Sequence, residues 1–265
     1  MTYRCTILGC GSSGGVPRIG MTWGACDPDN PKNRRSRCSA LIERKGPGGQ
    51  TAVLVDTSPD FRAQMLSTRL TALDAVLYTH DHADHTHGID DLRMVAFSMR
   101  RRVDVYFDAA TGKSLKHRFG YCFETPPGSP YTPMLNGHEI DGATPVAVQG
   151  GGGTITAQPI AQWHGSITSL GYRVSNLAYS PDISDIPAES ISLLEGLDVW
   201  IVDALRYTGH ESHFSVKQAL AWVERLKPKR TILTHMTSEL DYATLARDLP
   251  QGVEPAYDGM VVEFT

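Results

Sequence analysis

The stretch His80-Asp81-His82-Ala83-Asp84-His85 places three imidazoles and two carboxylates within six residues. It follows a mostly apolar run at residues 73–78, which predicts a buried strand. Packing does not explain such a stretch, because burying these polar groups without partners would cost free energy. Neutral imidazole and carboxylate are ligands of zinc and similar divalent cations. The stretch therefore predicts a metal site at the end of a strand.

The spacing of the ligand types suggests more than one metal ion. His80 and His82 can point the same way from an extended segment, while Asp84 and His85 turn toward a neighbouring point. One short loop can thus serve two ions side by side. The alternative is a solvated polar loop that happens to be rich in histidine, and we favour the metal site because of the density and order of the ligands.

Composition describes an ordinary globular protein. Hydrophobic residues make up 41% and charged residues 20% of the 265 residues, which allows a large core. No linker divides the chain, so we expect a single α/β domain at residues 1–265. The net charge of −4 gives no general attraction to nucleic acid or anionic lipid, and no apolar run is long enough for a membrane span. An odd count of five cysteines predicts reduced thiols and a cytoplasmic protein.

Three later side chains, His164, Asp182 and His235, each follow a predicted strand. A single histidine is more often a core or surface residue than a ligand. Together with the first stretch, however, these residues give the order His-x-His-x-Asp-His, then His, then Asp, then His. This order resembles that of the metallo-β-lactamase superfamily, and in particular its phosphodiesterase branch, which includes PhnP and tRNase Z.

The resemblance implies a four-layer αβ/βα sandwich with the site along the edge where its two sheets meet. It also implies two divalent ions: the first bound by His80, His82 and His164, the second by Asp84, His85 and His235, with Asp182 bridging both. Zinc fits this mixed nitrogen and oxygen set best, and manganese would also be accepted. Two such ions about 3.5–4 Å apart can activate water near neutral pH and polarise a phosphoryl oxygen.

Asp56 ends the strand predicted at residues 51–55. In the superfamily, an aspartate at this place holds a ligand histidine in position. The alternative is a cap for the helix predicted at residues 59–70, and the sequence leaves both roles open.

The triplet His213-Phe214-Ser215 resembles the His-x-Ser/Thr element that phosphodiesterase members place near the scissile phosphate. The resemblance implies that His213 and Ser215 bind substrate. It also implies two catalytic residues, Asp84 and His213, with His213 protonating the leaving oxygen. The alternative is the first turn of a helix capped by Ser212 or Ser215.

The sequence does not decide the roles of two loops and two cysteines. The glycine-rich residues 9–15 match a dinucleotide fingerprint, but no helix opens after them, so they form either a tight turn or an anion-binding wall of a substrate pocket. The aromatic loop predicted at residues 120–137 either covers the site or lies on the surface. PhnP-type proteins carry a cysteine cluster for a separate structural zinc. Only Cys26 and Cys38 stand in the matching region, so we do not predict that site.

These observations predict a metal-dependent hydrolase that cleaves phosphodiester bonds in a small cyclic phosphate or nucleotide-like substrate. The alternatives are a tRNase Z-like nuclease, a lactam or thioester hydrolase, and a binding protein without turnover. No long basic arm is evident, so we do not expect nucleic acid as a partner. His213 argues against a lactam or thioester substrate, and His82 stands where the oxygen-reducing diiron branch has glutamate. The sequence leaves a monomer and a homodimer both open.

Overall fold

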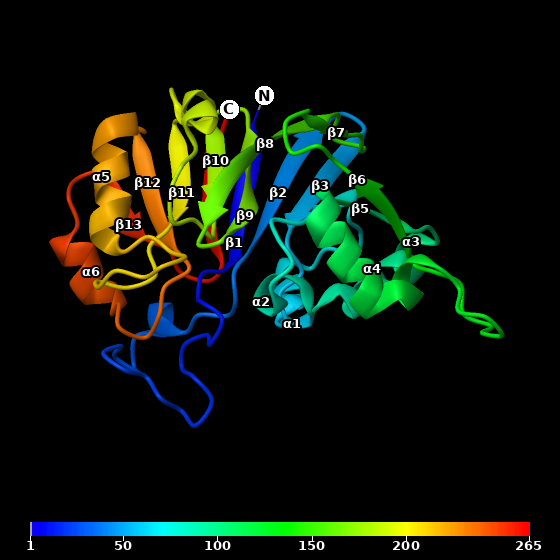
Figure 1. Ribbon diagram of the computed structural model, residues 1–265, viewed down its shortest axis with the longest axis horizontal. Helices are drawn as coiled ribbons and strands as arrows, with labels where there is room; N and C mark the ends of the chain where they lie inside the picture. The colour runs from blue at the N-terminus through cyan, green and yellow to red at the C-terminus, as the bar shows by residue number, and fades with distance from the viewer. Residues whose placement is uncertain (1) are drawn as a thin grey trace.

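The computed structural model describes residues 2–265 and contains two seven-stranded sheets packed face to face (Figure 1). The first sheet has the strand order β14-β1-β2-β3-β4-β5-β6. Its strands are β1 (Tyr3–Gly9), β2 (Ser39–Gly46), β3 (Gly49–Val55), β4 (Ala75–Leu77), β5 (Val103–Phe107), β6 (Leu135–Glu139) and β14 (Met260–Phe264).

The second sheet has the order β13-β12-β11-β10-β9-β8-β7. Its strands are β7 (Val146–Val148), β8 (Ile155–His164), β9 (Ile167–Val174), β10 (Leu177–Ser180), β11 (Val199–Asp203), β12 (Arg230–Thr234) and β13 (Val253–Pro255).

Helices cover the outer face of each sheet (Figure 1). Three lie against the first sheet, namely α1 (Phe61–Thr68), α3 (Leu92–Met99) and α4 (Ala109–Phe123), and two lie against the second, namely α5 (Val216–Leu226) and α6 (Tyr242–Asp248). The predicted four-layer αβ/βα sandwich is confirmed. Within residues 2–265, no helix has the length and apolar character needed to cross a bilayer.

Alternation along the strands of the first sheet separates two cores. In β3, Val53 and Val55 belong to the core shared by the two sheets, whereas Leu54 packs with the helices on the outer face. In β4, Leu77 belongs to the core shared by the two sheets and Val76 packs with the helices on the outer face. Successive side chains of a strand point to opposite faces, and both faces of this sheet are covered, which explains apolar runs without polar alternation.

After the metal loop, a short 3-10 helix, η2 (Ile89–Asp91), leads directly into α3, which ends where Arg100 adopts a φ of 53°. The loop expected at residues 120–137 is shorter, because α4 continues to Phe123 and β6 begins at Leu135. Asp108 caps the start of α4, its side chain accepting a hydrogen bond from the backbone N–H of Thr111.

The strand directions bring the candidate ligands to one edge. β3 and β4 run parallel in the first sheet, and β10, β11 and β12 run parallel in the second. Carboxyl ends of parallel strands lie at the same edge of a sheet. The short helix α2 (Ala83–Thr86), which carries part of the metal loop, lies at this edge between the two sheets (Figure 1).

Candidate functional site

The seven side chains predicted as metal ligands converge at the edge where the sheets meet. Their nitrogen and oxygen atoms form two neighbouring groups, in each of which all ligand atoms lie within 4.8 Å of one another. The first group contains His80, His82, His164 and Asp182, and the second contains Asp84, His85 and His235. Segments up to 155 positions apart in the sequence (235 − 80) therefore meet at one place.

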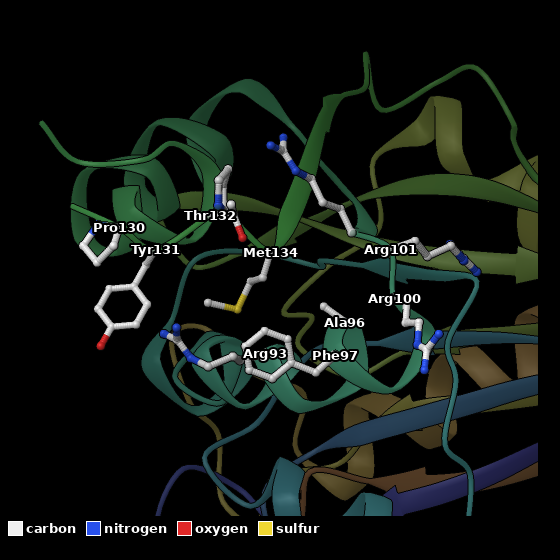
Figure 2. A pocket seen from close by; sticks show the side chains of 11 residues that line it. Arg93, Ala96, Phe97, Arg100, Arg101, Pro130, Tyr131, Thr132 and Met134 are labelled. Carbon is white, nitrogen blue, oxygen red and sulfur yellow. The ribbon is translucent and has the colours of Figure 1, made fainter. Parts of the chain in front are cut away.

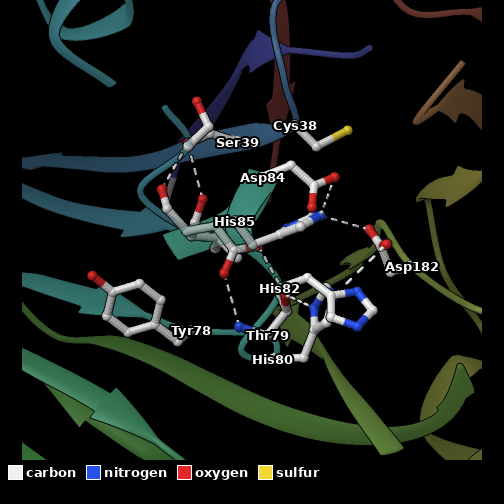
Figure 3. A network of polar contacts seen from close by, with 12 residues as sticks. Cys38, Ser39, Tyr78, Thr79, His80, His82, Asp84, His85 and Asp182 are labelled. Carbon is white, nitrogen blue, oxygen red and sulfur yellow. Dashed lines mark hydrogen bonds and ion pairs between the residues drawn. The ribbon is translucent and has the colours of Figure 1, made fainter. Parts of the chain in front are cut away.

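Asp182 lies between the two groups, with one oxygen toward each (Figure 3). Oδ2 is 3.8 Å from Nε2 of His80 and 3.6 Å from Nε2 of His164. Oδ1 is 2.9 Å from Nε2 of His85 and 3.5 Å from Nε2 of His235. This is the arrangement required of a carboxylate that bridges two ions.

Several of these atoms are buried without a hydrogen-bond partner among the described residues. They are Nε2 of His80 and His235, together with Nε2 of His85 and Oδ1 of Asp182, which lie 2.9 Å apart as an ion pair but form no aligned hydrogen bond. Orphaned polar atoms are costly, so their concentration at one point needs an explanation. Metal binding at the two groups would satisfy these atoms, and a set of imidazole nitrogens and carboxylate oxygens suits divalent cations such as zinc. The residues present thus fit a divalent metal.

Asp56 positions two of the ligand histidines, His85 directly and His80 through the hydroxyl of Thr79. Its Oδ2 lies 2.7 Å from Nδ1 of His85 and accepts a hydrogen bond from the hydroxyl of Thr79 at 2.8 Å. The same hydroxyl is 2.9 Å from Nδ1 of His80. These contacts engage Nδ1 and leave Nε2 of both imidazoles facing the candidate metals. Asp60, not Asp56, stands at the N-cap position of α1, so the geometry favours the histidine-positioning role.

The electrostatics of the site are dominated by carboxylates around a buried imidazole. Burial opposes a charge on His85, but Asp182, Asp56 and Asp84 together raise its pKa well above the ordinary value. Asp182 is buried as well, yet His235 and His85 hold its pKa well below the usual range. Metal binding at this place must therefore displace a proton from an imidazole, which makes the affinity fall in acid.

Asp203 is a residue of the site that no sequence motif singled out. It ends β11, is fully buried, and its Oδ2 lies 2.7 Å from Nδ1 of His213. Burial raises the pKa of Asp203 well above its ordinary value and lowers the pKa of His213. One signal in the sequence could have found Asp203: a carboxylate directly after an apolar strand, as at Asp56 and Asp182.

Ser215 differs from the expectation of a substrate-binding residue. Its hydroxyl accepts from the backbone N–H of Gln218, and its own backbone N–H donates to Oε1 of Gln218, which forms a capping box at the start of α5. The hydroxyl also donates to Oε1 of Gln218. Only 4% of Ser215 is exposed, and it does not line the pocket beside the ligands. The hydroxyl serves the helix because the first backbone N–H groups of a helix have no partner within it.

A cavity of about 320 Å³ opens beside the two ligand groups. Its inner wall includes Asp84, Asp182 and His213. Part of the glycine-rich segment, Ser12 to Gly14, forms another wall, so this segment does face the candidate site. Arg18, Arg206 and His210 also line the cavity.

The aromatic loop lies elsewhere. Tyr131 borders a separate cavity of about 550 Å³, together with Arg93, Phe97 and Arg100 of the α3 region (Figure 2). None of the residues around that cavity belongs to the ligand groups. The alternative of a surface loop therefore describes this segment better than a cover over the site.

The early cysteines have contacts of a different kind from a metal cluster. The thiol of Cys26 lies 3.5 Å from the carbonyl oxygens of Ser238 and Leu240, and Arg35 binds the same segment. The thiol of Cys38 lies 3.6 Å from the hydroxyl of Thr234. Within residues 2–265, the groups able to hold a metal contain no cysteine.

Comparison with known proteins agrees with this geometry. The family described as "Beta-lactamase superfamily domain" matches residues 51–236. A solved structure described as a new diphosphatase from the PhnP family is 35% identical over 100% of this chain and 98% of its own, with a TM-score of 0.89. The chain belongs to the metallo-β-lactamase superfamily, in its PhnP branch. Membership of the superfamily and the diphosphatase relative support hydrolase activity for this PhnP-branch protein.

Two other similar proteins say less about the function of this chain. Human tRNase Z, short form, shares the fold with a TM-score of 0.63 and 15% identity over 98% of each chain. An octanoyltransferase of Porphyromonas gingivalis is 33% identical over 262 residues, which are 97% of this chain and 51% of that protein. This chain thus spans about half the length of that curated relative.

Proposed function

We propose that this PhnP-branch hydrolase is one domain that hydrolyses phosphodiester bonds in a small cyclic phosphate or nucleotide-like substrate. In this proposal two divalent ions, zinc or manganese, are held by the seven ligands, with Asp182 between them. The observation that carries it is the position of Asp182, whose two oxygens face the two histidine groups at 2.9–3.8 Å. Two ions bound there would lower the pKa of a bound water and polarise a phosphoryl oxygen.

Asp84 supplies a base at the inner wall of the cavity. Its Oδ2 lies 3.6 Å from Nε2 of both His85 and His235, and 14% of its side chain remains exposed. Burial works against its charge, but His85 and His235 lower its pKa below the ordinary value. Asp84 is therefore a carboxylate at neutral pH, able to orient an attacking water and accept its proton.

His213 supplies the acid on the other side. Because Asp203 binds Nδ1, Nε2 of His213 is free to face the leaving oxygen. As the bond from water to phosphorus forms and the bond from phosphorus to the ester oxygen breaks, the imidazolium form of His213, which carries a proton on Nε2 as well as on Nδ1, donates the Nε2 proton to that oxygen. Asp203 keeps the imidazole oriented throughout the step.

The test uses purified protein reconstituted with zinc or manganese. We expect release of p-nitrophenol from bis-p-nitrophenyl phosphate and ring opening of nucleoside 2′,3′-cyclic phosphates. Precursor tRNA, a chromogenic β-lactam and a thioester serve as comparison substrates. Turnover of the lactam or thioester without turnover of any phosphate ester would refute the proposal, and cleavage restricted to precursor tRNA would favour the nuclease alternative.

A second candidate reaction is hydrolysis of a diphosphate bond. The observation in its favour is the full-length relative described as a diphosphatase, which is 35% identical to this chain. Attack at phosphorus by water is the same in both reactions, and only the leaving group changes from an alcohol to a phosphate. Phosphorus NMR of a dinucleoside diphosphate incubated with the enzyme distinguishes the two.

A further inference from the structure

Two arginines on the outer wall of the cavity have no acidic partner. Arg18 and Arg206 both line the cavity that contains Asp84 and His213. Within residues 2–265, no ion pair joins either arginine to a carboxylate. Neither belongs to the metal-ligand groups. Their charges are thus available to a ligand in the cavity.

The backbone after Arg206 positions its guanidinium group, and the side chain of Arg18 packs over Gly14. Arg18 lies over Gly14 so closely that a Cβ at that residue would come within 3.4 Å of its Cγ and Nε. Nη2 of Arg206 donates to the carbonyl of Gly209 at 2.9 Å, and its Nε donates to that of Thr208 at 3.4 Å. These bonds use two of the nitrogens of Arg206 and leave Nη1 for another acceptor.

The turn below Arg18 adds uncharged donors. The backbone N–H of Gly15 donates to the carbonyl of Ser12 at 2.8 Å, which closes a turn with Ser13 and Gly14 exposed at its tip. No protein group among residues 2–265 accepts from the backbone N–H groups of those two residues. Consecutive free N–H groups beside a guanidinium suit the oxygens of a phosphate.

We propose that Arg18, Arg206 and the tip of this turn form a subsite for a second phosphate, so that the preferred substrate is a diphosphate. This inference rests on the second candidate reaction of the proposed function, hydrolysis of a diphosphate bond, since it assumes that the scissile phosphorus lies against Asp84 and His213. A simple diester has one negative charge, which would leave the two arginines without a counter-charge. The cavity volume of about 320 Å³ is at the lower limit for ligand pockets, so the two phosphates must be close together.

In the resulting step, the oxygen of water forms a bond to the phosphorus beside Asp84. The bond from that phosphorus to the bridging oxygen breaks, and the bridging oxygen leaves with the electron pair as part of the second phosphate. His213 donates a proton to it and Asp84 accepts the proton of the water. Arg18 and Arg206 stabilise the negative charge of the departing phosphate.

Equilibrium binding tests the subsite without turnover. The probes are AMP and α,β-methylene-ADP, whose bridge is not hydrolysed, measured by calorimetry with the metal-loaded protein. We expect the diphosphate analogue to bind at least about tenfold more tightly than AMP, and Arg18→Ala to remove most of that preference while AMP binding changes less than about threefold. Arg206→Gln, which keeps a donor for Gly209, should act in the same direction. Arg100→Ala, in the separate cavity, is the matched control.

Turnover separates this inference from the proposed function. The substrates are diadenosine diphosphate, adenosine 2′,3′-cyclic phosphate and its 5′-phosphorylated form, in which the second phosphate is remote. We expect Arg18→Ala to lower kcat/KM about tenfold or more for the diphosphate and less than about threefold for the simple cyclic ester. If Arg18→Ala lowers kcat/KM for the 5′-phosphorylated ester as much as for the diphosphate, the subsite binds a remote phosphate. The inference that the preferred substrate is a diphosphate is then overturned.

The remaining outcomes are also decisive. Unchanged diphosphate binding in both arginine variants would overturn the subsite, whatever the turnover. If the wild-type protein hydrolyses none of the three substrates while Arg18→Ala still abolishes the preference for α,β-methylene-ADP, the subsite stands and the proposed function fails.

Discussion

Oδ2 of Asp203 lies 2.7 Å from Nδ1 of His213, and both side chains stand within reach of Asp182, whose Oδ2 is 3.9 Å from the same nitrogen. The pair joins the end of β11 to the segment before α5. A backbone N–H, that of Ile183, also donates to Asp203 at 3.2 Å. The imidazole of His213 is therefore held in one orientation beside the candidate metal ligands.

This pair gives the first prediction. We expect His213→Ala to lower kcat for a phosphate ester by about 100- to 1,000-fold with a small change in KM, because it removes the acid. Asp203→Asn should lower kcat by about 10- to 100-fold, since it only disturbs the orientation of the imidazole. The double variant should be little worse than His213→Ala, because the two residues act as one unit.

A second histidine and aspartate pair offers the control. Nε2 of His138 lies 2.8 Å from Oδ1 of Asp104 on β6 and β5, away from the ligand groups. His138→Ala should leave kcat within about twofold of wild type, as surface changes away from a site usually do. Additive losses in the Asp203 and His213 double variant would contradict the coupling.

The second prediction concerns the position of Asp182 between the ligand groups. We expect Asp182→Ala to contain less than one metal ion per chain by elemental analysis, because both groups lose an oxygen ligand. His82→Ala should retain one ion, since it leaves the group of Asp84, His85 and His235 intact. Equal metal content in the two variants would argue against a bridging role for Asp182.

The third prediction concerns metal removal. Chelation should lower Tm by several degrees, because ligands that bind only the folded state stabilise it. The difference between loaded and chelated protein should shrink as the pH falls, since the proton on His85, whose pKa is raised by nearby carboxylates, competes with the metal. Thermal scans at several pH values measure this, and a difference that grows in acid would contradict it.

The fourth prediction concerns Arg35, which is 98% buried and connects the early loop to the segment after His235. Its guanidinium donates to the carbonyls of Thr237 at 3.0 Å and Leu240 at 2.6 Å. Arg35→Ala should lower the free energy of unfolding by about 2–5 kcal/mol, because it leaves buried carbonyls without donors. Urea unfolding measures this. The neighbouring Arg34 is exposed, so Arg34→Ala should lower the free energy of unfolding by less than about 1 kcal/mol.

The fifth prediction concerns Asp258, which accepts hydrogen bonds from Ser36 and from the backbone of Cys10. Burial raises its pKa to about 6. The folded state then binds a proton more tightly than the unfolded state, so stability falls as the pH rises from about 4 to 6. Relative to Asp258→Asn, the free energy of unfolding of the chelated wild-type protein should fall by roughly 2–3 kcal/mol between pH 4 and pH 7. Parallel pH profiles of the two proteins would contradict this, and Asp29→Asn, an exposed substitution, should follow the wild type.

Much of the site could be predicted from residue types and spacing. The stretch from His80 to His85 contains four of the candidate ligands within one short segment, and each of the later ligands follows a predicted strand. The fold followed from the same pattern, through its resemblance to one superfamily. Such features are local, because strand period and ligand chemistry depend on neighbouring residues alone.

The sequence by itself therefore determined the kinds of ligand and their order along the chain. Only the tertiary structure decided which oxygen of Asp182 faces which histidine, that Asp203 holds His213, and that the hydroxyl of Ser215 caps a helix. It also placed Arg18 and Arg206 around one cavity, although the two residues are 188 positions apart in the sequence (206 − 18). Distances across the site are set by how the two sheets pack, and that packing depends on contacts between residues far apart in the chain.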